Sequence, residues 1–171
     1  MEKRLKWSAY IASLSALLYA LPHFWWGLGI GFMFPGDFET APDDFFAKAI
    51  GYWVMGGLAL VAAWLAFRFT RSSSFRPVGK LMIVSAWIGS AGLTLWGFSY
   101  FVLQFQLAIG RVQSAPAFAA QDASPMAIWG LFWYSLFLIG GVSIGFASYY
   151  AQKIQRQARH SQDLESDEVA N

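Results

Sequence analysis

The sequence of 171 residues contains no cysteine and only two histidines. The lack of cysteine excludes disulfides, thiolate nucleophiles, thiolate-ligated haem, iron–sulfur clusters and cysteine-based zinc sites. A haem held by two histidines of one chain is excluded as well, because His23 lies in an apolar run and His160 in the polar tail. A haem bound by His23 and a methionine such as Met55 or Met82 is possible, but nothing in the sequence supports it. We therefore expect neither a metal ion nor a cofactor.

Charged residues are also few. Charged residues make up 13% of the chain and hydrophobic residues 57%, whereas soluble domains carry roughly 25% charged residues. The nine tryptophans and seven tyrosines suit side chains that lie at a membrane–water boundary. This composition indicates an integral membrane protein.

Four long runs contain no Asp, Glu, Lys or Arg, at residues of about 7–34, 49–67, 81–109 and 126–150. Each is long enough for a helix that crosses an apolar core of about 30 Å, which needs roughly 20 residues. Lipid requires that backbone polar groups are satisfied internally, and the runs lack the alternation of barrel strands, so we predict helices. The first run follows basic residues as a signal peptide does, but it is too long and no cleavage site follows. We interpret it as a retained anchor.

The sequence thus predicts an all-α, polytopic membrane protein with a four-transmembrane-helix bundle in residues 1–150. Residues 151–171 form a polar tail that starts basic and ends acidic. Few large apolar residues follow Ile154, so we expect the tail to be disordered after its first turns. The residues after about Ala158 should be dispensable for membrane insertion and for the fold.

The basic residues are unevenly distributed along the chain. Ten of the twelve lie in the N-terminus, in the connection 68–80 or in the tail, and only Lys48 and Arg111 lie elsewhere. Basic residues collect on the cytoplasmic side of membrane proteins. We therefore predict both termini in the cytoplasm and a multi-pass protein of a bacterial plasma (inner) membrane.

The stretch YALPHFWWGLGIGF, residues 19–32, places a titratable ring inside the first run. Pro22 cannot donate a backbone hydrogen bond, so the helix should kink there and free the carbonyl of Leu18. We expect His23 to face the bundle interior, within hydrogen-bonding reach of a polar group on the third or fourth span. The candidate cluster for ligand binding or structural hydrogen bonds comprises Tyr19, His23, Trp26, Thr94, Gln104, Tyr134 and Ser135.

Two interpretations of His23 stay open. The ring is either a neutral strut that satisfies a neighbouring polar group, or it lines a cavity where it binds or protonates a ligand. A serine-based triad is excluded because the spans contain no carboxylate. No phosphate-binding glycine loop and no base-stacking basic patch is present, so we expect neither nucleotide nor nucleic acid.

Three classes of function remain. The first is a non-enzymatic accessory or scaffold subunit, or a small-ligand-binding membrane protein. The sequence favours this class, and we predict no catalytic residue. The second is a small transporter component that works as an oligomer. The third is a membrane enzyme that acts on a lipid or quinone with His23 as acid/base. Expected partners are the lipid bilayer and either another membrane subunit or a second copy of the chain.

Two motifs carry a family resemblance. LYALPHFWWGLG in the first run resembles the His-aromatic-Trp-x-x-Gly signature of a small bacterial four-span membrane family, the domain of unknown function 3995 family. LFWYSLFLIGG in the fourth run is similar to that family's aromatic-Tyr-Ser stretch. The resemblance covers most of residues 7–150 in layout and only these two motifs in detail. It implies four spans and a role for His23 and Trp26, but no activity, since none is established for the family.

Overall fold

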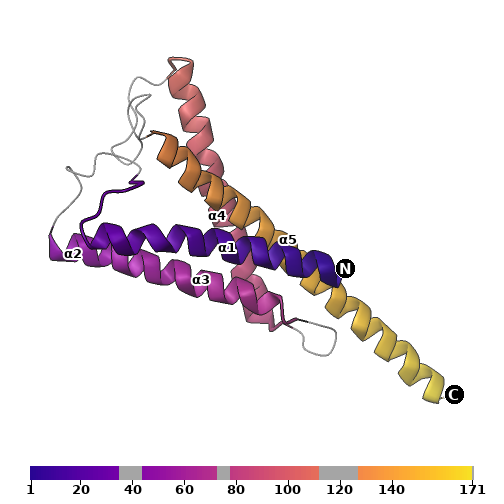
Figure 1. Cartoon of the computed structure of the whole chain (residues 1–171). Helices are drawn as coiled ribbons and strands as arrows, with labels where there is room; N and C mark the ends of the chain where they lie inside the picture. The colour runs from indigo at the N-terminus through magenta and orange to yellow at the C-terminus, as the bar shows by residue number, and fades with distance from the viewer. Residues whose placement is uncertain (35–43, 73–77, 112–126, 171) are drawn as a thin grey trace.

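The computed structural model describes residues 1–34, 44–72, 78–111 and 127–170, and within these ranges it is entirely helical (Figure 1). The elements are α1 (Glu2–Gly27), α2 (Phe45–Lys48), a π-helical turn (Ala49–Val54), α3 (Met55–Phe69), α4 (Lys80–Ala108) and α5 (Ala127–Ala170). Because α2, the π-helical turn and α3 follow one another without a gap, they form one continuous helical segment. The predicted all-α class is confirmed for these residues.

Within the described residues, three helical stretches are long and apolar enough to cross a membrane: Ala49–Phe69, Lys80–Ala108 and Trp129–Leu164. They overlap the second, third and fourth predicted spans, and the last of them extends well beyond the predicted end at residue 150. Helix α1 has 26 residues but does not meet the same test of composition. The mean hydropathy of α1 is lowered by its serines and tryptophans and by Pro22 and His23, although no residue from Trp7 to Gly27 is charged.

The helices form a row in the order α3, α1, α5, α4. Helix α1 packs against α3 on one side and α5 on the other, and α4 packs against α5. Helices α3 and α4, at the two ends of the row, do not pack along each other. Figure 1 shows α1 and α3 side by side, and both chain termini at the end of the molecule where α3 ends and α4 begins.

Glycines set the contact between α4 and α5. A Cβ atom at Gly97 would lie 2.8 Å from the backbone nitrogen of Leu138, and one at Gly141 would lie 2.7 Å from the backbone nitrogen of Thr94. The Ser90 hydroxyl donates to the Gly141 carbonyl over 2.7 Å in the same interface. Small residues allow such close approach of helix backbones in lipid.

The first predicted span was too long, because α1 ends at Gly27 and not near residue 34. Gly29 adopts a φ of +85°, and its N–H donates to the Trp26 carbonyl over 2.9 Å. The N–H of Ile30 donates to the Trp25 carbonyl, also over 2.9 Å. This pair of bonds is a Schellman motif, which ends a helix at a left-handed glycine.

The tail also differs from its prediction. Helix α5 continues without a break to Ala170, where the sequence led us to expect disorder. No Gly or Pro follows Gly145, and Gln, Arg, Lys, Glu and Ala residues favour helix. The side chain of Ile154 is buried, and the Gln155 amide donates to the Val78 carbonyl over 3.0 Å, so the first turns dock on the connection to α4. From Arg159 to Leu164 every side chain is exposed.

Candidate functional site

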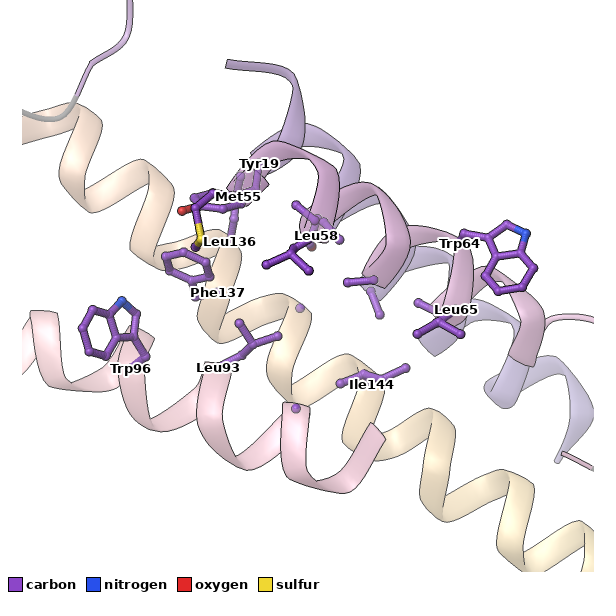
Figure 2. A pocket seen from close by; sticks show the side chains of 18 of the residues that line it. Tyr19, Met55, Leu58, Trp64, Leu65, Leu93, Trp96, Leu136, Phe137 and Ile144 are labelled. Atoms are coloured by element: carbon purple, nitrogen blue, oxygen red, sulfur yellow. The ribbon is translucent and has the colours of Figure 1, made fainter. Parts of the chain in front are cut away.

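A cavity of about 1040 Å³ lies where α3 and α4 diverge, and residues of α1, α3, α4 and α5 line it. Small-molecule pockets typically enclose about 300–1,000 Å³, so this cavity is at the upper end of the range. Figure 2 shows Leu58 and Leu65 of α3 on one side, Leu93 of α4 on the other, and Ile144 of α5 between the two helices.

The cavity opens sideways between α3 and α4. Rim residues on both helices are exposed although they line it: the exposed fraction is 58% for Leu58 of α3 and 81% for Leu81 of α4. Since the two helices do not pack along each other, nothing in the described residues closes this side. In a membrane, the opening would face acyl chains.

The length of the cavity follows from the residues that line it. On α1 they run from Ala12 to Trp26, which is about 21 Å at a helical rise of about 1.5 Å per residue. On α4 they run from Leu81 to Trp96, which is about 22 Å by the same rise. The cavity therefore follows the helices over about two thirds of an apolar bilayer core of about 30 Å.

The lining is apolar along most of this length. Its width comes from small residues that leave space between the helices, namely Ala12, Ala16, Ala59, Ala62, Gly89 and Gly140. Large aliphatic side chains, including Leu65 and Leu93, form the walls. Arg68 is the one Asp, Glu, Lys or Arg among the described lining residues, and it lies at the end of α3.

His23 lies toward the other end of the cavity, with an exposed fraction of 5%. Its Nδ1 atom is 2.9 Å from the Tyr19 carbonyl oxygen. A carbonyl oxygen can only accept a hydrogen bond, so Nδ1 carries the proton and donates it. In the neutral ring, Nε2 is then an acceptor, and no described residue forms a hydrogen bond to it.

Aromatic rings surround His23. The ring centroid of Tyr19 is 4.4 Å from that of His23, and the centroid of Trp26 is 4.9 Å away on the following turn. Trp133 of α5 meets Trp26 edge to face, with centroids 5.8 Å apart at 89°. These contacts hold the imidazole in one orientation beside the cavity.

The turn after α1 lies at this end of the cavity, where Phe34 contributes to the lining. The indole N–H groups of Trp25 and Trp26 both donate to the Phe32 carbonyl, over 3.0 and 2.9 Å. The indole of Trp133 donates to the carbonyl of Met33 over 2.8 Å. Met33 has a backbone φ of +62°, which residues other than glycine rarely adopt. Three tryptophans thus tie the turn to α1 and α5.

The structure brings only part of the predicted cluster together. Tyr19, His23, Trp26 and Tyr134 line the cavity. Thr94 lies instead in the contact of α4 with α5, beneath Gly141.

The other two predicted residues, Gln104 and Ser135, make no hydrogen bond to His23 in the described part of the chain. The Gln104 amide nitrogen is enclosed and has no partner among the described residues, and the Ser135 hydroxyl donates to the Leu131 carbonyl of its own helix over 2.7 Å. Neither lines the cavity.

The hydrogen bond of His23 also differs from its prediction. The sequence suggested a partner on the third or fourth span, whereas the bond stays within α1, because residues four apart lie one above the other on the same helix face. Pro22 is fully buried, and the helix continues past it for another turn.

Sequence reasoning missed Trp133 and Phe137 of α5, which line the cavity next to Tyr19. A signal for them exists, because Trp129, Trp133 and Phe137 recur at a spacing of four and share a helix face. No group of three or more His, Asp or Glu residues able to hold a metal ion is present in the described part of the chain.

The fold and the cavity together define a class: an all-helical protein with helices suited to cross a membrane, arranged around an apolar cavity with a single histidine. No protein-family model, curated protein or solved structure matches the chain. The resemblance to the domain of unknown function 3995 family stays a prediction.

Proposed function

We propose that this is a four-span protein of a bacterial inner membrane, in which α1 also crosses the membrane, as the first span along the chain. Helix α1 packs between α3 and α5, and its outward face carries exposed apolar side chains, among them Leu14, Leu18 and Leu21. Soluble proteins rarely expose apolar patches of this extent, whereas lipid-facing helices do so as a rule. Three of the residues that lower the hydropathy of α1, namely Tyr19, His23 and Trp26, line the cavity on its inner side.

The distribution of charge supports cytoplasmic termini. The described basic residues near the chain termini, the end of α3 and the start of α4 are Lys3, Arg4, Lys6, Arg68, Arg71, Lys80, Lys153, Arg156 and Arg159. Lys48 and Arg111 lie at the opposite helix ends. The positive-inside rule assigns the first group to the cytoplasm.

We infer that the protein binds a long-chain amphiphile in the cavity. The observation that carries this function is the sideways opening between α3 and α4, which leads from the acyl-chain region into an apolar space about 21 Å long. A lipid or prenyl chain enters such a space without crossing water. A binding or accessory role fits better than catalysis, because no carboxylate of the described residues lines the cavity to exchange protons with His23.

Filling the cavity tests this function. Ala62→Phe together with Gly89→Phe places a ring on each side of the space, and a Cβ atom at Gly89 meets no atom within 4 Å, so the helix accepts it. We expect native mass spectrometry from mild detergent to show a co-purified amphiphile on the wild-type protein and none on this variant.

The matched control is Gly57→Phe with Ala91→Phe, two positions on the same helices that do not line the cavity. A Cβ atom at Gly57 also meets nothing within 4 Å. The control should retain the amphiphile. Equal amounts of bound amphiphile on both variants, at equal thermal stability, would refute the cavity as its site.

A further inference from the structure

We propose that His23 selects amphiphiles whose polar head donates a hydrogen bond, such as a long-chain alcohol or another hydroxyl-headed lipid. This inference rests on the proposed function and names the ligand class of the same cavity. It depends on three observations: the tautomer of His23, the position of the ring along the cavity, and the location of the cationic side chains.

The tautomer makes His23 an acceptor. The Tyr19 carbonyl, 2.9 Å from Nδ1, accepts a hydrogen bond from the one N–H group of the neutral ring. Nε2 keeps a free lone pair, and the ring lines the cavity. A head that offers only carbonyl or ether oxygens would place an acceptor against this acceptor. A hydroxyl head supplies the missing proton.

The position of the ring suits a head group. His23 lies four residues before the end of α1, which is about 6 Å of helix, so it is near a membrane boundary and not at the midplane. Three hydroxyl-bearing side chains of the lining, Tyr19, Tyr52 and Tyr134, lie near this end. The ring of Tyr52 contacts Trp26, and the rings of Tyr19 and Tyr134 both contact Phe137. The apolar lining continues from here toward Ala12, in the direction that a tail would take.

The cations argue against an anionic head at His23. Arg68, the charged residue of the described lining, lies at the end of α3, whereas His23 packs beside Gly56 near the start of that helix. Twelve residues separate Gly56 from Arg68, which is about 18 Å along the helix. A phosphate or carboxylate placed against Nε2 would meet a lone pair and no described positive charge.

The test compares geranylgeraniol with its methyl ether, which have the same chain and differ in one donor hydrogen. Each is titrated into the full-length protein in nanodiscs. We expect the alcohol to bind about 3- to 10-fold more tightly, the range that one net hydrogen bond provides. His23→Phe should abolish this preference while the chain still binds. Ser85→Ala, which removes a hydroxyl of the lining on the first half of α4, should keep it.

A second measurement does not depend on the His23 variant. With His160 replaced by Asn, ¹⁵N spectra of histidine-labelled protein report on His23 alone. The alcohol should shift the Nε2 resonance and leave Nδ1 nearly unchanged, and the ether should shift neither.

The outcomes separate the two proposals. Equal affinity for alcohol and ether, or a preference that survives His23→Phe, would overturn the selection by His23 and leave the cavity as a chain-binding site. If neither compound binds to the folded wild-type protein, the amphiphile-binding function fails together with the selection.

Discussion

The contact of α4 with α5 gives the sharpest prediction for stability, because it is made backbone to backbone. Gly97 faces α5 so closely that a Cβ atom would lie 2.8 Å from the Leu138 nitrogen and 2.9 Å from the Tyr134 carbonyl oxygen. A flexible side chain could rotate away from the new methyl group, but these backbone atoms cannot. Gly97→Ala therefore forces the two helices apart.

The expected loss is about 1–3 kcal/mol, the typical penalty of overpacking a well-packed interface. For a chain of this size, 1 kcal/mol corresponds to a shift of about 2–4 °C in Tm, so Tm should fall by about 2–12 °C. No other helix contact of α4 can compensate for the lost packing, because α4 packs along α5 and along no second helix. Thermal unfolding in one detergent, followed by tryptophan fluorescence, measures it.

Gly92→Ala is the matched control on the same helix. A Cβ atom there meets nothing within 4 Å, so the substitution should be neutral or should stabilise the helix by up to about 1 kcal/mol, the difference in helix propensity between glycine and alanine. The two variants have the same chemistry and opposite expected signs. If Gly97→Ala is as stable as Gly92→Ala, the close approach of α4 and α5 is not present in the protein.

Two further predictions concern topology and the tail. Cysteine introduced at Asp44 should react with an impermeant maleimide in intact cells, and cysteine at Ser161 only after lysis; the reverse pattern would invert the proposed orientation. Truncation after Ala158 should change Tm by less than about 2 °C, because the described side chains from Arg159 to Leu164 are exposed and offer little apolar area to bury. A larger loss of stability would mean that the tail docks on another surface.

Much of the helical layout could be predicted from the sequence, since length and the absence of charge are sufficient to locate helices in lipid. The third predicted span, 81–109, differs from α4 by one residue at each end. The ends that were misjudged depend on local conformation. Gly29 stops α1 inside an apolar run that hydropathy does not divide, and helix-favouring residues extend α5 beyond the polar boundary.

The candidate site was only partly predictable for a different physical reason. In a soluble helix, alternation of polar and apolar faces shows which side is buried, but a helix in lipid is apolar on every side. His23 and Tyr19 stood out because they are polar. The walls of the cavity, such as Leu58 and Leu93, look in the sequence like any lipid-facing leucine.

The order in which the helices pack explains why the cavity exists. A four-helix bundle closes when its first and last helices also meet, but here the row α3, α1, α5, α4 stays open between its ends. Gly97 and Gly141 hold α4 tightly against α5 on one face, while the alanines and glycines of the lining, such as Ala62 and Gly89, have no side chains long enough to reach across the other. Small residues therefore have opposite effects on the two faces. They bring backbones together where helices meet, and they leave space where helices part.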